Sequence, residues 1–315
     1  MRELLRATRW ENAIITPIAG DASARQYARL DHPSAILMSD PSGDTKRFAQ
    51  IATILRHANL CPPDIFAHDP DRGMMIISDL GRMDFAHHLA ANPDDSPSLY
   101  QTATDVLVTL YQQKIDADLP RMTHDVAADM IGLAAQHYAP NMQGEIALHD
   151  ALRCAFDAHV DPALHLSLRD FHAENLIWRP EKTGTDRAGL LDFQDACMAP
   201  MGYDVMSLVR DARRDIDTDT SEMAINRFLK LTGLSGSDAS AHLACVGAQR
   251  NLRILGIFAR LATLNGKQNY LNFLPRVWAY LMTDLGHPAL SDLRDCVTTH
   301  LPTPDATTLS RLRQK

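Results

Sequence analysis

The sequence predicts an α+β protein with two lobes, a small antiparallel β N-lobe that includes one helix and a large, mainly helical C-lobe. In the first 95 residues, short apolar runs are broken by Gly, Pro and Asp, which is typical of strands joined by turns. Beyond residue 95, apolar residues recur with the period of a helix. The character changes near residues 79–95, and the expected lobes are residues 1–80 and 81–315.

Five runs of strand length lie in the N-lobe, and their sequences are IITPI, RQYARL, SAILMS, PDIFAH and MMIIS. Between the third and fourth runs, Phe48, Ile51, Ile54 and Leu55 follow helical spacing. This spacing indicates an amphipathic helix of about three turns, a common helix length. The expected order is three strands, one helix and two more strands in a mainly antiparallel sheet.

The C-lobe begins with long segments of helical period, such as SLYQTATDVLVTLYQQ and EIALHDALRCAFDAHV. Two short apolar pieces interrupt them, LIW at residues 176–178 and GLLDF at 189–193. Because the turn-rich sequence PEKTGTDRA separates these pieces, we expect a hairpin embedded among helices.

Composition excludes several classes of protein. The 315 residues carry a formal net charge of −8, which disfavours the broad cationic surface that nucleic acids require. The five cysteines are scattered without a C-x-x-C pair, so neither a disulfide framework nor a zinc site is expected. No apolar run approaches the ~20 residues of a membrane span. We expect a cytoplasmic protein with no nucleic-acid or membrane partner, and no obligate protein partner is evident.

The segment LRDFHAENLIW (residues 168–178) places Asp170 and Asn175 five positions apart, and Asp192 follows at the end of the later apolar piece. In the kinase arrangement R-D-x-x-x-x-N, the Asp accepts the hydroxyl proton and the Asn binds a metal ion. A second Asp, on the following hairpin, also binds the metal ion. Mg²⁺ takes most of its ligands from phosphate oxygens and water, so one Asn and one Asp are sufficient protein ligands. The pattern therefore indicates phosphoryl transfer with ATP and Mg²⁺.

A simpler account is that these three residues only cap turns, where Asp and Asn are common. Their joint spacing favours the functional interpretation. The P-loop, Rossmann and zincin motifs do not occur. The pairs His87/His88 and His165/His172 lack a third metal ligand and are expected to be surface or packing histidines, His172 being a partial exception within the loop.

Two parts of a kinase depart from the usual pattern. The third predicted strand has Met38 where protein kinases place a phosphate-binding Lys. Lys46, Arg25 or Arg29 could supply that charge. The candidate phosphate loop, AGDASARQY at residues 19–27, has one Gly, but its small Ala and Ser residues allow backbone N–H groups to approach a phosphate. In the later helical stretch, Arg250 and Arg253 could face the cleft between the lobes, but a solvated face is the expected account.

Several motifs together resemble a known family, the anomeric kinases of N-acetylmuramate and N-acetylglucosamine, within the aminoglycoside phosphotransferase and choline kinase-like superfamily. They are GDASARQYARL, ISDLG, LRDFHAENLIW, LLDFQDA, YDVMSLVRDARRDI and RNLRILGIFARL. The likeness runs from about Gly20 to about residue 290. It implies a protein-kinase-like bilobal fold and ATP- and Mg²⁺-dependent phosphorylation of the C1 hydroxyl of an amino sugar, in a cytoplasmic route of cell-wall recycling.

The resemblance implies roles for individual residues. Asp170 in the catalytic loop (168–178) becomes the catalytic base, and Asn175 with Asp192 of the hairpin (189–195) become the metal ligands. Nucleotide contacts are expected at Gly20, Asp21, Ala22, Ser23, Met38, Ile77, Ser78, Asp79 and Leu80. Acceptor contacts are expected at His172, Glu174 and Asp195, and structural support at Arg169 and Asp204.

Leu168 departs from the superfamily, which usually has His there, and we expect packing to replace the hydrogen bonds of that His. Two other functions stay open. The acceptor could be an aminoglycoside, a choline-like cation or another small alcohol. Alternatively, the absent Lys and the replaced His would suit a pseudokinase that acts as a binding module.

Overall fold

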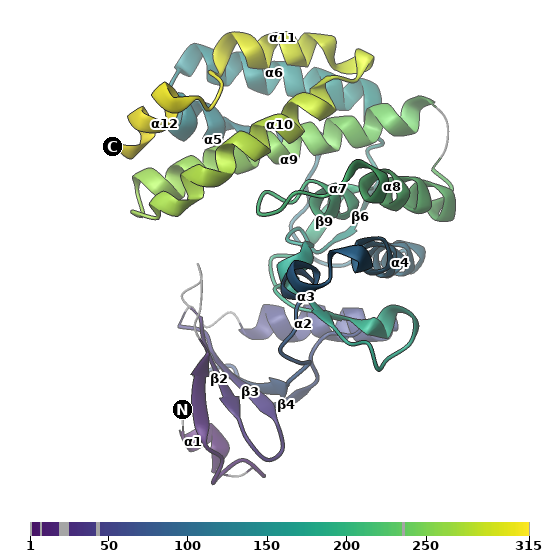
Figure 1. Ribbon diagram of the computed structural model, residues 1–315, viewed down its shortest axis with the longest axis vertical. Coiled ribbons are helices and arrows are strands. Elements are labelled where there is room, and N and C mark those ends of the chain that lie inside the picture. The colour runs from purple at the N-terminus through teal and green to yellow at the C-terminus, as the bar shows by residue number, and fades with distance from the viewer. Residues whose placement is uncertain (1, 7, 19–24, 42–44, 235–236, 315) are drawn as a thin grey trace. The chain divides into compact units, whose positions relative to one another are not determined.

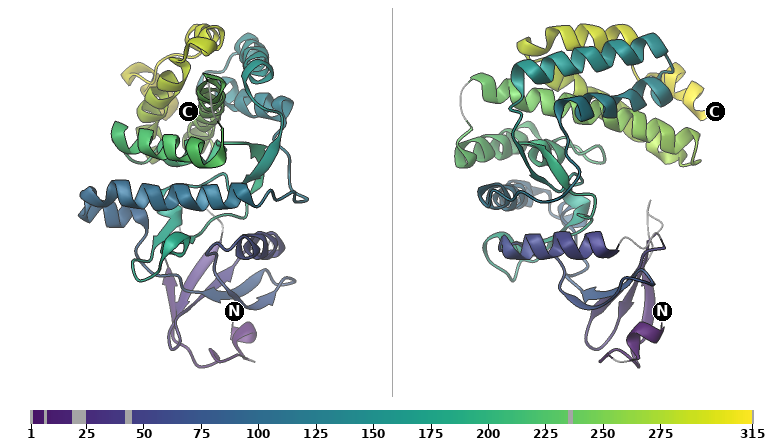
Figure 2. Two further views of the ribbon diagram at one scale, coloured as in Figure 1. Left: turned by 90° about the vertical axis from the view of Figure 1, so that its right-hand side faces the viewer. Right: turned by 180° about the vertical axis from the view of Figure 1, so that it is seen from behind.

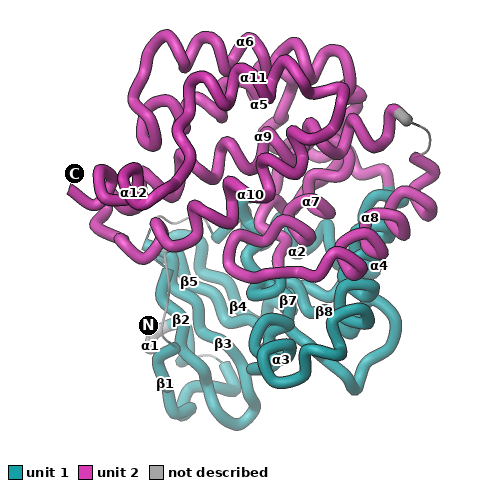
Figure 3. The backbone as a smooth tube through the Cα atoms, turned by 45° about the horizontal axis from the view of Figure 1, so that its top comes forward, with its two compact units in different colours: residues 1–113, 173–195 teal, residues 114–172, 196–315 magenta. Residues whose placement is uncertain are grey.

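The structure, a computed structural model, describes residues 2–6, 8–18, 25–41, 45–234 and 237–314. It forms two compact units, which Figure 3 shows in different colours. Unit 1 contains residues 1–113 and 173–195, and unit 2 contains residues 114–172 and 196–315. The lobe boundary expected at residue 80 is a different division of the chain and stays a prediction.

Unit 1 contains a five-stranded antiparallel sheet in the order β1-β2-β3-β5-β4 (Figure 1). The predicted order of three strands, one helix and two strands is confirmed. The elements are β1 (Ile15–Ile18), β2 (Gln26–Leu30), β3 (Ala35–Ser39), α2 (Thr45–His57), β4 (Ile65–Asp69) and β5 (Met74–Ser78).

Burial explains why these short runs form this sheet. The inner strand β5 buries four consecutive residues, Met74 to Ile77, as expected for a strand covered on both faces. Helix α2 buries Phe48, Ile51 and Leu55, the apolar stripe that the sequence shows. The short helix α1 (Arg2–Leu5) precedes the sheet, and Leu5 joins a cluster with Trp10 and residues of β2, β3 and β5.

The remainder of unit 1 consists of α3 (Phe85–Ala91), α4 (Ser96–Gln112) and the hairpin of β7 (Leu176–Trp178) and β8 (Ala188–Leu190). The hairpin is antiparallel, with Ile177 opposite Gly189, and confirms the prediction. A Cβ atom at Gly189 would lie 2.9 Å from Leu80 Cδ1, so a larger residue here would have to displace the Leu80 side chain next to the end of β5.

Unit 2 is a helical bundle with one two-stranded sheet, β6 (Leu164–Ser167) against β9 (Cys197–Pro200). The 27-residue helix α9 (Ser237–Thr263) packs against most other helices of the unit (Figure 2). Those helices are α5 (His124–Leu133), α6 (Met142–His159), α7 (Tyr203–Val209), α10 (Leu274–Leu285) and α12 (Ala306–Arg313). The unit is completed by α8 (Thr218–Thr232) and α11 (Ser291–His300).

The predicted antiparallel β N-terminal part with a helix between its third and fourth strands and the mainly helical remainder are therefore confirmed, whereas the short helix α1 was not predicted. Within the described ranges, no helix combines the length and apolarity that crossing a membrane requires.

Candidate active site

In unit 2, the loop that follows β6 is held by a buried carboxylate. Gly202, with φ of +83°, is the N-cap of α7, and Asp204 lies in the first turn of that helix. The carboxylate of Asp204 accepts hydrogen bonds from Ser167 Oγ at 2.7 Å, Leu168 N at 2.7 Å and Arg169 N at 2.9 Å. Asp204 therefore fixes three consecutive residues directly before Asp170.

One turn further along α7, Ser207 holds the same loop from its carbonyl side. Its hydroxyl donates to the carbonyl oxygen of Arg169 at 3.2 Å, and Arg250 Nη2 donates to Ser207 Oγ at 2.8 Å. Because a guanidinium cannot accept a hydrogen bond, the hydroxyl proton of Ser207 must point to Arg169. Arg250 is 5% exposed, so the expectation of a solvated face was wrong for this residue.

The backbone before Asp170 is strained. Arg169 has φ of +66°, a left-handed conformation that costs a non-glycine residue of order 1–3 kcal/mol. Asp204 and Ser207 bond its N–H and its carbonyl, and Asp170 N bonds Leu168 O at 2.8 Å. Leu168 is 3% exposed, so this position contributes packing where the superfamily usually has His. Such strain, held by several contacts, is typical of functional sites.

Burial controls the protonation of two groups near this loop. It raises the pKa of Asp204 to about 6, against the opposing effect of the hydrogen bonds that this carboxylate accepts. Burial also holds the pKa of His172 well below its usual value, and the charges of Arg213 and Arg250 act in the same direction. Arg213 Nη1 lies 3.4 Å from His172 Nε2, which is the side of a neutral ring that can accept.

In unit 1, the β7–β8 hairpin presents the two candidate metal ligands. Asn175 ends the 3₁₀ turn before β7, and its carbonyl accepts from Leu191 N at 3.0 Å. Asp192 follows with φ of +54°, again a left-handed conformation for a non-glycine residue. Its carboxylate is 49% exposed and accepts from Gln194 Nε2 at 2.7 Å. Phe193 is buried and packs on Phe48 of α2, with ring centroids 4.8 Å apart.

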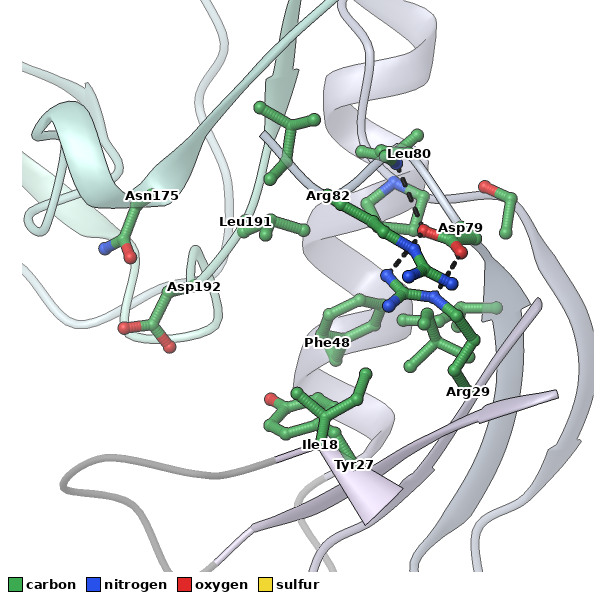
Figure 4. A pocket seen from close by; sticks show the side chains of 16 residues that line it. Ile18, Tyr27, Arg29, Phe48, Asp79, Leu80, Arg82, Asn175, Leu191 and Asp192 are labelled. Atoms are coloured by element: carbon green, nitrogen blue, oxygen red, sulfur yellow. Dashed lines mark hydrogen bonds and ion pairs between the residues drawn. The ribbon is translucent and has the colours of Figure 1, made fainter. Parts of the chain in front are cut away.

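Asn175 and Asp192 both line a cavity of about 440 Å³ within unit 1, which Figure 4 shows from close by. Asn175 and Asp192 lie at one end, and Arg29, Asp79 and Arg82 lie at the other. Most of the wall between these ends is apolar. The lining consists of Ile18, Tyr27, Arg29, Ile36, Phe48, Pro63, Ile77, Ser78, Asp79, Leu80, Gly81, Arg82, Asn175, Ile177, Leu191 and Asp192.

At the far end of this cavity, Asp79 is tied to β2. Its carboxylate accepts from Arg29 Nε at 2.7 Å and Nη2 at 3.2 Å, and from Ser34 Oγ at 2.6 Å. Burial raises the pKa of Asp79, but the bonds from Arg29 and Ser34 outweigh it and leave that pKa below its usual value. Asp79 is therefore an ionised anchor for the segment that follows β5.

Some of the other expected site residues line the cavity, and others do not. Ile77 to Leu80 line the cavity, whereas Met38 is fully buried in β3 and does not belong to the cavity lining that the structure describes. Glu174 and Asp195 are exposed, and His172 is 6% exposed. The nucleotide contacts expected at Gly20, Asp21, Ala22 and Ser23 lie outside the described residues.

Asn175 and Asp192 fit a magnesium ion by their chemistry, because an amide oxygen and a carboxylate are hard donors and Mg²⁺ takes its other ligands from phosphates and water. In the part of the chain that the structure describes, no three His, Cys, Asp or Glu side chains are placed to hold a metal ion together. His87 and His88 instead bond Asp84 and Asp95.

The strained backbone before Asp170, the Asn/Asp pair at the end of a cavity and the small antiparallel sheet are features that the sequence led us to expect of a phosphotransferase. The chain belongs to the phosphotransferase enzyme family, whose model matches residues 14–243. It is therefore a kinase of the small-molecule type.

Two similar proteins carry the name N-acetylmuramate/N-acetylglucosamine kinase. The one from Caulobacter vibrioides is 32% identical, over 91% of this chain and 82% of its own. The one from Pseudomonas aeruginosa is 30% identical, over 92% of this chain and 90% of its own. Among solved structures, a choline/ethanolamine kinase family protein from Mesorhizobium loti matches with a TM-score of 0.64 at 15% identity, covering 100% of this chain and 98% of that one. This likeness confirms the kinase-like fold.

Proposed function

We propose that this protein transfers the γ-phosphoryl group of ATP to the C1 hydroxyl of N-acetylmuramate or N-acetylglucosamine. The observation that carries the proposal is the match to two relatives named for these substrates, at 32% and 30% identity over 91% and 92% of the chain. Because ATP is the donor, we place the reaction in the cytoplasm. The same relatives are named as kinases, which favours an enzyme over a binding module.

The cavity of unit 1 supports a site for ATP. Its volume of about 440 Å³ is in the range of small-molecule pockets, and its apolar wall suits the faces of an adenine ring. The β5 ladder ends at Ser78, so the backbone of Asp79 and Leu80 lies beyond the sheet and lines the cavity. The polar end with Asn175 and Asp192 is then the phosphate end.

Asn175 and Asp192 would hold Mg²⁺ at that end. A bound Mg²⁺ neutralises phosphate charge and orients the phosphate oxygens. The left-handed backbone of Asp192 sets the direction in which its side chain leaves the chain, and Gln194 Nε2 donates a hydrogen bond to one of its carboxylate oxygens. The carboxylate of Asp192 is thus oriented before any nucleotide binds.

Asp170 is the proposed base. Its carboxylate accepts the proton of the C1 hydroxyl while the hydroxyl oxygen bonds the γ-phosphorus and the bond to the ADP oxygen breaks. The products are the sugar 1-phosphate, ADP and one proton. Phosphoryl transfer has a loose transition state, so the position of Asp170 contributes more to the rate than its basicity. Asp204 and Ser207 supply that position by holding both sides of Arg169.

A panel of acceptors tests the proposal. The protein is incubated with Mg-[γ-³²P]ATP and N-acetylmuramate, N-acetylglucosamine, an aminoglycoside or choline, and transfer to the acceptor is measured. We expect transfer to the two amino sugars and none with the Asp170→Asn variant as control. Transfer only to the aminoglycoside or to choline contradicts the proposed substrate, and absence of transfer to all four contradicts the proposed activity.

A further inference from the structure

The cation that should hold the nucleotide phosphates is absent from its usual place, because β3 carries the buried Met38 there. The sequence left three other cationic residues as candidates for binding the phosphates. Lys46 is exposed on the first turn of α2, and Arg29 pairs with Asp79 at the far end of the cavity. Arg25, directly before β2, lies beside Asp192. The geometry therefore selects one of the three.

Strand pairing builds the surroundings of Arg25. In the β2–β3 register, Gln26 lies opposite Ser39, so Arg25 and Asp40 come next across the same pair of strands. Arg25 Nε donates to Asp40 Oδ2 at 2.7 Å, and the two side chains are only 12% and 3% exposed. Opposite charges at such facing positions stabilise the pairing, and the buried carboxylate fixes the plane of the guanidinium.

The other side of the same guanidinium faces a candidate metal ligand. Arg25 Nη1 lies 3.9 Å from Asp192 Oδ1, an ion-pair distance too long for a hydrogen bond. Phosphate oxygens that share a metal ion with Asp192 must lie within a few ångströms of that carboxylate. A guanidinium held at this place presents N–H groups in the fork geometry that matches phosphate.

We propose that Arg25 binds the phosphates of the nucleotide in place of the usual lysine on the third strand, and that Asp40 is its positioning residue. The inference rests on the proposed use of ATP. In this arrangement an arginine before β2 takes the place of the lysine on β3, and an aspartate directly after β3 holds it, so that the β2–β3 hairpin supplies both residues.

Nucleotide binding tests this without turnover. Isothermal titration of the full chain measures Kd for MgATP, MgADP and adenosine in the wild type and in Arg25→Met. We expect Kd for MgATP and MgADP to rise about 10- to 100-fold, the loss of one charge-assisted hydrogen bond, while Kd for adenosine changes less than about twofold. Arg72→Met in the β4–β5 turn, a half-exposed surface arginine of the same unit, is the matched control and should bind all three like the wild type.

Folding is controlled separately, because Arg25→Met leaves the carboxylate of Asp40 buried without this partner. Arg25→Lys keeps a charge and should lose less ATP affinity, and Arg25→Met with Asp40→Asn removes both charges. If Asp40 acts through Arg25, the double variant binds MgATP no more weakly than Arg25→Met alone. Retained adenosine binding and an unchanged melting temperature report an intact pocket.

The outcomes separate this inference from the proposed function. Wild-type affinity for MgATP in a folded Arg25→Met variant overturns the inference and leaves the proposed function standing. An equal loss of adenosine and MgATP binding also overturns it, because the residue would then support the pocket rather than the phosphates. A wild-type protein that binds no MgATP contradicts the proposed function and the inference together.

Discussion

The carboxylate of Asp204 gives the sharpest test of how the loop before Asp170 is held. It accepts hydrogen bonds from three donors, Ser167 Oγ, Leu168 N and Arg169 N. The substitution Asp204→Asn keeps the shape but replaces one accepting oxygen by an NH₂ group, which must face a donor. At least one hydrogen bond to a charged acceptor is lost, worth about 1.5–3 kcal/mol.

The stability of the fold should nevertheless change little. Burial raises the pKa of Asp204 from 3.8 to about 6, so its ionised form disfavours the folded state at neutral pH by about 3 kcal/mol. The neutral amide of Asn removes this penalty while it loses the hydrogen bond. The removed penalty offsets the cost of placing an NH₂ group against a donor, so the substitution should reduce the rate much more than the free energy of unfolding.

The raised pKa of Asp204 also determines how the free energy of unfolding changes with pH. Since the pKa of Asp204 in the folded state lies above 3.8, its protonation favours the folded state. That stabilisation is complete below pH about 4 and is lost as the pH rises through about 6. The fall in unfolding free energy across this window should be smaller in Asp204→Asn than in the wild type.

The assay combines steady-state kinetics at neutral pH with urea unfolding. We expect kcat to fall about 100-fold, as for a catalytic group displaced by about 1 Å, with KM for both substrates nearly unchanged. Asp284→Asn is the matched control, because Asp284 is equally buried in unit 2, its pKa is also raised to about 6, and it bonds Arg210 and Asn251 rather than the loop. A folded Asp204→Asn variant with wild-type kcat refutes the reasoning, as does an equal loss of kcat in Asp284→Asn.

Three further predictions concern single side chains. Asp192→Ala should abolish Mg²⁺-dependent turnover without lowering the melting temperature, and an undiminished rate at any Mg²⁺ concentration would contradict its role as a metal ligand. Asp170→Asn should lower kcat by about 10²- to 10⁴-fold with Kd for MgATP unchanged in calorimetry, whereas a changed Kd alone would assign it to nucleotide binding. Ser207→Ala should lower kcat about 10-fold, while Ser221→Ala, a buried serine on α8, should not; equal rates in both variants would argue against the bond to the carbonyl of Arg169.

Most of the fold could be predicted from local sequence patterns. The strand MMIIS could be predicted because it is a short, unbroken apolar run, and the hairpin because a turn-rich segment separates LIW from GLLDF. Likewise, the spacing of Asp170 and Asn175 is a local signal. Asp204 had no such signal, since it lies 36 positions beyond Leu168, and only the family resemblance pointed to it.

Contacts between distant residues could not be predicted in this way. Arg250 interrupts an apolar stripe, and periodicity assigns such a charge to solvent, although in the fold it lies among Ser207, the carbonyl of Arg210 and the buried Asp211. Arg25 and Asp40 are 15 positions apart, and only the register of β2 against β3 brings them together. A cross-strand search for opposite charges at the ends of the predicted strands would have found this pair.

The central claim is that the phosphoryl group goes to the C1 hydroxyl of an amino sugar. N-acetylglucosamine labelled with ¹³C at C1, and N-acetylmuramate labelled in the same way, are incubated with MgATP and the wild-type protein, and the products are observed by ³¹P and ¹³C NMR. The account predicts a new phosphate resonance that is split by coupling to the labelled C1. A new sugar phosphomonoester resonance without that coupling, or ATP that stays unconsumed with both sugars, would contradict it.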